Sequence, residues 1–401
     1  MTRPAAGTVP AAGHRPRAAA LLIAAVTGLL AALALAGPAR AHGADTPDGT
    51  DYRVRITGVT PAVPGLTVRT IEAGARLELT NHTGRVVEIP GYADEPYLEI
   101  RPDGTYENLN SPTTYRTRTL AGDTPVPAGV DPTAPPRWQR TGTDPVARWH
   151  DQRTTWLAAD PPPGVRADPT REQRVRDWTV PVRLAGTTVT VTGTLDWVPP
   201  PDPWAWWAWI LLGTVTIGAL GILPGRHAPA ATGVLGALCV VGGGCAVAFA
   251  VARELDAGTT GAGAILIGLL ARHGLPLAVG LFAVAVGGRV LIRRSATDFA
   301  LVLAGLFLAI FHGAVNAGVL ARAVAPAPWP ATWARLVIAV AVAVGAGVAA
   351  AGLLRMHSAA RRAPRRATEP DDAGSPSTGG PTGGDTPAPD IPADAGYANA
   401  S

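Results

Sequence analysis

A histidine that follows an Ala-x-Ala sequence has the most specific chemical potential in this chain. Ala39-Arg40-Ala41 is the pattern at which signal peptides are cleaved, so the mature chain would begin at His42. A free α-amino group and the imidazole of the same residue are two nitrogen ligands that suit the tetragonal geometry of Cu(II). The sequence predicts copper binding at this residue, with an ordinary terminal histidine as the alternative.

Further ligands for a copper ion would come from His82, His150 and Asp151. His82 lies in a predicted turn, where an ordinary exposed side chain is the alternative. Trp149, His150 and Asp151, with Trp156 nearby, form a polar and aromatic cluster. This cluster predicts either a ligand or recognition site, or core tryptophans beside a hydrogen-bonded histidine. The exported part of the chain has no methionine to act as a thioether ligand for Cu(I).

His312 and Asn316 lie four residues apart in an apolar stretch, and therefore on one face of a helix. Polar side chains at hydrocarbon depth are costly and point to a functional site. Hydrogen bonds between helices that hold a membrane bundle together are the alternative. With Arg272 and His273, this pair would form an outward-facing polar pocket in a transport or relay component.

The tract at residues 92–118 is rich in polar and aromatic side chains, including Glu95, Tyr97 and Asn108. It could bind a partner protein or a glycan, and a solvated loop surface is the alternative. The sequence has no G-x-S-x-G, H-E-x-x-H, Walker A, dinucleotide-binding or C-x-x-C motif. We therefore expect a protein that is not an enzyme.

Composition points to a membrane protein. Apolar residues make up 47% of the chain and charged residues only 16%, against roughly 25% charged in soluble proteins. The charge deficit lies in the second half, which predicts the lipid bilayer as a partner. The net charge is only +4 and the arginines are scattered or next to apolar stretches, so nucleic-acid binding is not expected. Cys239 and Cys245 both lie in an apolar stretch, which leaves the exported region without disulfides.

Residues 1–41 have the charged, apolar and small-residue regions of a signal peptide. Five transmembrane helices are predicted at residues 204–222, 231–251, 276–292, 300–320 and 336–354. Residues 261–270 predict an interfacial half-helix or part of a longer tilted span. The arginine-rich helix ends are expected in the cytoplasm, which places residues 42–198 outside and the tail at 356–401 inside. The composition of the tail predicts disorder.

Residues 42–198 are predicted to form an all-β domain. Short β-prone runs separated by turn residues occur at 52–59, 66–71, 76–79, 85–89, 97–100 and 187–197. This pattern favours an immunoglobulin-like sandwich. Residues 144–156 fit either a helix or a strand. The proline-rich residues 199–203 predict a stiff linker to an α-helical membrane bundle of about five transmembrane helices at residues 204–355.

The sequence Ala39-Arg40-Ala41-His42, with this layout, resembles exported copper-binding proteins of the bacterial copper-resistance family. The resemblance implies a β-sandwich outside a multi-span membrane region, with copper at the terminal histidine. The layout also resembles multi-span envelope proteins of actinobacteria, which implies no activity. We expect a cell-envelope membrane protein whose extracytoplasmic domain binds copper, another metal or another envelope protein. A transport or relay component and a structural or assembly factor are the alternatives.

Overall fold

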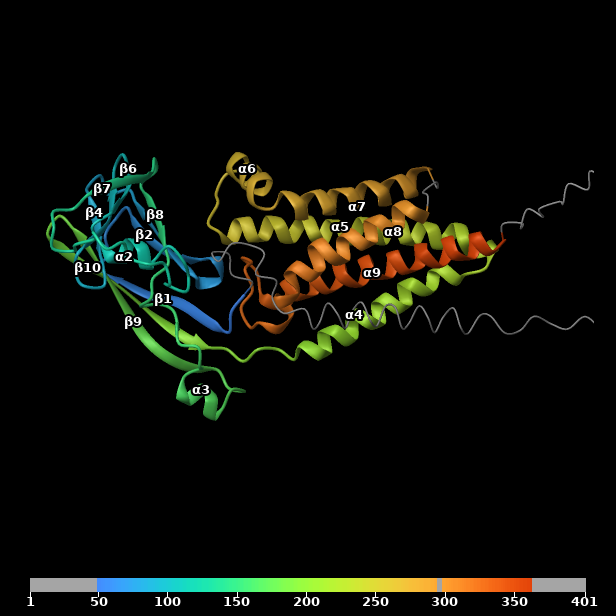
Figure 1. Ribbon diagram of the computed structural model, residues 1–401, viewed down its shortest axis with the longest axis horizontal. Coiled ribbons are helices and arrows are strands. Elements are labelled where there is room, and N and C mark those ends of the chain that lie inside the picture. Colours follow the sequence, from blue (N-terminus) through green and yellow to red (C-terminus); the bar gives the residue numbers. More distant parts are fainter. Residues whose placement is uncertain (1–48, 294–297, 363–401) are drawn as a thin grey trace, which may run out of the picture. The chain divides into compact units, whose positions relative to one another are not determined.

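The computed structural model describes residues 49–293 and 298–362. The predicted signal peptide, His42 and the tail beyond residue 362 lie outside the described residues. Residues 49–198 form antiparallel β-structure, and residues 203–293 and 298–362 are almost entirely helical (Figure 1). The predicted order of an all-β region followed by an apolar helical region is confirmed.

The β region contains two antiparallel sheets. The larger sheet has the order β1 (Tyr52–Thr60), β10 (Thr187–Trp197), β9 (Gln173–Leu184), β4 (Val87–Pro90), β5 (Pro96–Arg101), β6 (Gly104–Asn108) and β7 (Trp138–Gly142). The smaller sheet has the order β2 (Leu66–Ile71), β3 (Arg76–Asn81) and β8 (Val146–Trp149). Three short helices lie between strands, namely η1 (Glu72–Gly74), α2 (Pro112–Arg116) and α3 (Pro163–Ala167).

Both sheets contribute to one apolar core. Leu77 and Leu79 of β3 are buried together with Val180 and Val182 of β9, and each pair alternates with more polar neighbours along its strand. This period of two places every second side chain on the inner face. Each fully buried aliphatic side chain contributes about 1.5–3 kcal/mol relative to an exposed one, so the core can hold the domain without disulfides.

Of the two structures predicted for residues 144–156, a helix or a strand, the chain forms the strand β8. Ala147 and Trp149 of β8 are buried and alternate with the more exposed Arg148, and the strand pairs with β3. The helical alternative for this segment is therefore wrong, because its burial has the period of a strand rather than that of a helix. The chain then turns at residues 151–155 instead of continuing in a regular element.

The helical region begins with α4 (Pro203–Gly218), whose first turn is capped by the Asp202 carboxylate. Its other elements are η2 (Ala219–Ile222), η3 (Gly225–His227), α5 (Ala228–Asp256), α6 (Ala262–Arg272), α7 (Gly274–Arg293), α8 (Asp298–Phe307), η4 (Leu308–Ala314), η5 (Ala317–Ala321) and α9 (Ala331–Arg362). Four helical segments are long and apolar enough to cross a membrane: Pro203–Ile222, Gly225–Asp256, Gly274–Arg293 and Ala331–Arg361.

The fourth of the five predicted spans, at residues 300–320, is not a continuous α-helix. The α-helical α8 passes into a π-helix, η4, and then into the 3₁₀-helix η5. The Asn316 amide donates to the carbonyl oxygen of His312 at 2.7 Å, one turn earlier. A side chain that bonds a backbone carbonyl in this way competes with regular helical hydrogen bonds. The predicted half-helix at 261–270 corresponds to α6, which has 11 residues.

Small residues allow α5 and α7 to pack closely, and the two helices run side by side in Figure 1. A Cβ atom on Gly243 would lie 2.5 Å from the carbonyl oxygen of Gly280, and one on Gly287 would lie 2.4 Å from that of Gly236. Such distances exclude any side chain at these positions. Cys239 is buried in the same region and is not disulfide-bonded.

One end of the helical bundle is fixed to the β region. Asp51, just before β1, accepts hydrogen bonds from Arg322 Nη1 at 2.6 Å and from the Ala323 N–H at 2.9 Å. The Asp256 carboxylate at the end of α5 accepts from the Ala73 N–H at 2.8 Å. Asp256 and Arg322, each at the end of a helical segment, therefore lie at the same end of the bundle, against the β region.

The opposite end of the bundle is held by Arg355 of α9. Its Nη1 donates to Thr232 Oγ1 of α5 at 2.8 Å and lies 3.7 Å from the carboxylate of Asp298, the first residue of α8. Residues 298–321 therefore begin at this opposite end and finish at the end that contacts the β region. Although irregular, the segment runs the length of the bundle.

Candidate functional site

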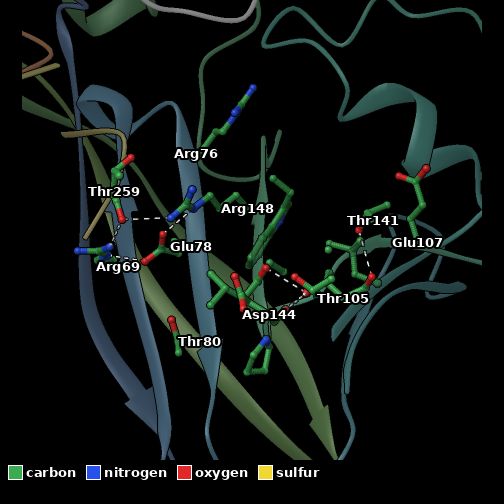
Figure 2. A pocket seen from close by; sticks show the side chains of 18 of the residues that line it. Arg69, Arg76, Glu78, Thr80, Thr105, Glu107, Thr141, Asp144, Arg148 and Thr259 are labelled. Atoms are coloured by element: carbon green, nitrogen blue, oxygen red, sulfur yellow. Dashed lines mark hydrogen bonds and ion pairs between the residues drawn. The ribbon is translucent and has the colours of Figure 1, made fainter. Parts of the chain in front are cut away.

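A groove of about 1270 Å³ lies where the smaller sheet meets residues 258–272 (Figure 2). Its walls come from β2, β3, β8, the tract at residues 97–118 and α6. Five arginines, three carboxylic acids and nine threonines line it, so guanidinium and hydroxyl donors dominate its surface. The charged lining residues are Arg69, Arg76, Arg118, Arg148, Arg272, Glu78, Glu107 and Asp144.

Three charged residues form a row across the smaller sheet. Arg69 of β2 is directly opposite Glu78 of β3, and Glu78 is directly opposite Arg148 of β8. Residues opposite each other in antiparallel strands are neighbours on the same face. The Nε atoms of Arg69 and Arg148 donate to the two carboxylate oxygens of Glu78 at 2.6 and 2.7 Å (Figure 2). Glu78 is buried, whereas Arg69 and Arg148 are 50% and 41% exposed.

The same two arginines reach the helical region. Arg69 Nη2 and Arg148 Nη2 both donate to the carbonyl oxygen of Gly258, at 3.0 and 3.1 Å. Within the described ranges, the Nη1 groups of these arginines have no hydrogen-bond partner. Two guanidiniums thus share one carboxylate, which leaves this row with one net positive charge and with two free donor groups. This arrangement suits an anion, because guanidinium donors match the geometry of phosphate and carboxylate groups.

The tract at residues 92–118 is not the solvated loop surface that was one alternative. Glu95 is only 5% exposed, and its carboxylate accepts from Ser111 Oγ and Thr113 Oγ1 at 2.7 Å each and from the Ala93 N–H at 2.9 Å. Burial alone would raise the pKa of Glu95, but these hydrogen bonds to the ionised form outweigh it and lower the pKa.

The Tyr97 hydroxyl and Thr117 Oγ1, at 2.6 Å, extend this buried network to the wall of the groove. Burial raises the pKa of the Tyr97 phenol, which keeps it neutral. Asn108 is also buried, and its amide bonds the carbonyl of Pro96 and the N–H groups of Asn110 and Arg137. The tract is thus a rigid backing for the groove, because its polar groups are paired with one another.

His150 and Asp151 are engaged in structural hydrogen bonds. His150 Nε2 accepts from Arg76 Nε at 3.0 Å, so its Nδ1 carries the proton and faces the Ala75 carbonyl at 2.9 Å. The Asp151 carboxylate accepts from Trp149 Nε1 at 2.9 Å and from the Arg153 guanidinium at 2.7 and 2.8 Å. These partners use the atoms that would ligate a metal.

The structure does not bring the predicted metal ligands together. His82 and His150 both line the groove, but His82 is exposed beside the turn after β3, whereas His150 and Asp151 are buried in their own contacts. Across residues 49–293 and 298–362, no three His, Cys, Asp or Glu side chains form a group that could hold a metal ion. Because His42 lies outside the described residues, copper binding at the terminal histidine stays a prediction.

A buried carboxylate that sequence reasoning missed lies beneath the groove. Glu254 of α5 is fully buried; it forms an ion pair with Arg272 of α6 and accepts from Thr259 Oγ1 at 2.6 Å. His273 Nε2 is 3.6 Å from the same carboxylate. Gly268 makes this possible, because a Cβ atom there would collide with Glu254. Arg272 and His273 therefore contact Glu254. They do not form the predicted polar pocket with His312.

His312 and Asn316 lie inside the bundle and both are buried. Arg253 Nη1 donates to the Asn316 side-chain oxygen at 3.1 Å. The His312 ring meets the edge of Phe249 with 6.0 Å between ring centroids. Neither His312 ring nitrogen has a hydrogen-bond partner in the described part of the chain. Asn316 thus forms the kind of hydrogen bond between helices that was the alternative to a functional site. His312 is a buried polar side chain whose ring nitrogens have no hydrogen-bond partner among the described residues.

Sequence patterns place Arg69, Glu78 and Arg148 on predicted or possible strands, but they do not reveal that the three side chains meet. The polar face of a strand is ordinarily solvated, so a charge there is uninformative until the strand register is known. No family model, curated protein or solved structure matches the chain.

Proposed function

We propose that this chain is a non-enzymatic membrane protein of the cell envelope whose extracytoplasmic domain binds an anionic ligand in the groove. The observation that carries the proposal is the row formed by Arg69, Glu78 and Arg148, in which two guanidiniums share one carboxylate. A network with equal numbers of positive and negative charges would not attract an anion. This row has one positive charge in excess, and threonine hydroxyls lie in the same groove.

The arrangement of the helices supports a bundle of five spans with the β region outside it, and the two antiparallel sheets around one apolar core favour an immunoglobulin-like sandwich for that region. Residues 298–321 run from one end of the bundle to the other and count as the fifth crossing. An odd number of crossings puts the β region and the end of α9 on opposite sides of the membrane. That parity agrees with export of the β region by the predicted signal peptide and with the arginines that follow the last span.

The arginines at the end of the bundle near the β region do not oppose this orientation. Arg272 is paired with Glu254 and Arg322 with Asp51. Arg335 donates to the carbonyl oxygens of Arg322 and Ala323. Arg322 joins the helices to the β region, and Arg272 and Arg335 join segments of the helical region to one another. They therefore count as structural contacts rather than as a cytoplasmic charge cluster.

The test uses the full chain in neutral detergent, titrated calorimetrically with glycerol 1-phosphate and, as an uncharged control, glycerol. We expect saturable binding of glycerol 1-phosphate alone. The variant Arg69→Gln/Arg148→Gln should bind about tenfold more weakly, which corresponds to about 1.4 kcal/mol. The control Arg55→Gln/Arg85→Gln removes two exposed arginines outside the groove and should bind like wild type.

A second variant separates binding from folding. Arg69→Lys/Arg148→Lys keeps two positive charges beside Glu78 but removes the planar donor fork, so it should stay folded and still bind more weakly. Equal affinity in the wild type and both groove variants, or no saturable binding by the wild type, would refute the proposed function.

A transport or relay component is the second candidate, and His312 is the observation that favours it. A buried imidazole whose nitrogens have no structural partner within the described residues can take a ligand or a proton. His312 also lies in the π-helix η4, and π-helical segments are frequent at functional sites.

A further inference from the structure

The helix α6 presents an exposed apolar face. Leu266, Ile267 and Leu270 are 56%, 69% and 62% exposed. Positions three and four residues apart are neighbours on a helix surface, so Leu270 adjoins both Ile267 and Leu266 and the three side chains form one continuous surface. With only 11 residues, α6 is too short to cross a bilayer, and its apolar face is therefore not that of a transmembrane helix.

This helix is also a wall of the groove. Ile267, Gly268 and Arg272 line the groove, so its apolar face and its polar lining meet on one element. The position of α6 is fixed, because Arg272 pairs with the buried Glu254 and Gly268 lies against the same carboxylate. The connection before α6 is held by the hydrogen bonds from Arg69 and Arg148 to Gly258.

We propose that the ligand of the groove is an anionic lipid of the outer leaflet, bound by its phosphate headgroup at Arg69 and Arg148 with its acyl chains along Leu266, Ile267 and Leu270. This inference rests on the proposed function and adds the class of ligand. The surplus positive charge matches a phosphate diester, and the adjacent apolar face matches hydrocarbon chains.

Two features favour a lipid over a soluble anion. A soluble anion would contact the guanidiniums but not the exposed apolar side chains of α6, whereas an amphiphile contacts both. The volume of about 1270 Å³ also exceeds the roughly 300–1,000 Å³ of ordinary small-molecule pockets. It can therefore hold a phosphate together with a bulky headgroup substituent, which would hydrogen-bond the threonine hydroxyls.

The test uses the full chain in phosphatidylcholine nanodiscs doped with a photoreactive lipid that carries a diazirine in its acyl chain. Photoreactive phosphatidylglycerol is compared with photoreactive phosphatidylcholine, and mass spectrometry locates the labelled peptide. We expect phosphatidylglycerol to label residues 262–275 about tenfold more than phosphatidylcholine, a preference that corresponds to about 1.4 kcal/mol. Arg69→Gln/Arg148→Gln should abolish the preference, and Arg55→Gln/Arg85→Gln should preserve it.

A variant of the apolar face tests the acyl-chain half of the proposal. Leu266→Ser/Leu270→Ser changes two exposed side chains that do not line the groove, so it should reduce phosphatidylglycerol labelling without changing the affinity of the detergent-solubilised chain for glycerol 1-phosphate. Equal labelling by the two lipids would show that α6 only touches bulk lipid and would overturn this inference. If glycerol 1-phosphate still binds in an arginine-dependent way, the proposed function survives that outcome; if neither probe binds, both fail.

Discussion

The substitution Glu95→Gln tests whether the polar tract at residues 92–118 is a structural backing for the groove. Two hydroxyl groups donate to one carboxylate oxygen of Glu95 and one backbone N–H donates to the other. An amide has only one acceptor oxygen. Whichever way the new side-chain amide were oriented, at least one of these donors would face an NH₂ group and lose its acceptor.

The magnitude follows from these three hydrogen bonds. A hydrogen bond to a charged group contributes about 1.5–3 kcal/mol, against about 1 kcal/mol for a hydrogen bond to a neutral group. Two weakened bonds and one lost bond therefore destabilise the β region by about 2–4 kcal/mol at neutral pH. Glu99→Gln, on the strand β5 that follows Glu95, is the control, because its contact with Arg101 is partly exposed and contributes under about 1 kcal/mol.

The dependence on pH identifies the charge as the cause. The pKa of Glu95 is lowered in the folded chain, so its contribution is present above the ordinary value of 4.5 and is lost as the pH falls through the folded pKa. The difference between wild type and Glu95→Gln should be largest at pH 7 and shrink in acid. Hydrogen exchange of peptides from residues 92–118, corrected for intrinsic rates, measures it in the full chain. A difference that is constant with pH would refute this reasoning.

Three further predictions concern contacts in the bundle and with the β region. Asp51→Asn weakens the hydrogen bonds to Arg322 and Ala323 by about 1–3 kcal/mol, so tryptic cleavage after Arg322 should accelerate. Gly243→Ala should lower the thermal midpoint in detergent, since overpacking against Gly280 costs about 1–3 kcal/mol, whereas Gly244→Ala meets open space and should not. His312→Phe should leave the thermal midpoint unchanged or raise it, because no hydrogen bond is lost; a clear decrease would show that the imidazole holds a polar partner.

Apolar patterning predicted much of the fold. The strands at Leu66–Ile71 and Thr187–Trp197 match their predicted bounds, because each lies between turn residues and has a clear apolar pattern. The strand Gln173–Leu184 was missed, although Trp178, Val180 and Val182 alternate in the core. Its Pro181 argues against a strand in sequence, yet the structure places this proline opposite Thr190 within the sheet.

The groove could not be predicted because it depends on strand register and on a contact between regions. Glu78 and Arg148 are 70 positions apart, and only the pairing of β3 with β8 brings them together. The buried Glu254 was equally hidden, since its partner Arg272 belongs to another helix. Hydrophobic periodicity reports which face of an element is buried, and it carries no information on which polar residues of distant elements become neighbours.

The glycine that joins the groove to the helices gives a last test. Gly258 has a φ of +79°, and a Cβ atom there would lie 2.7 Å from Glu78 Oε2. Gly258→Ala therefore combines backbone strain of about 1–2 kcal/mol with a collision that separates Gly258 from Arg69 and Arg148.

Gly261→Ala is the matched control for this variant. Gly261 has a similar φ of +89° but open space around its Cβ position, so its substitution brings the strain without the collision. Both variants should melt at lower temperature, and only Gly258→Ala should weaken binding of glycerol 1-phosphate, because only it displaces the guanidiniums. Equal losses of affinity would show that these guanidiniums do not form the anion site. An unchanged affinity in both variants would show that the site does not depend on the hydrogen bonds to Gly258. Ligand binding at the arginines would then not be coupled to the position of α6.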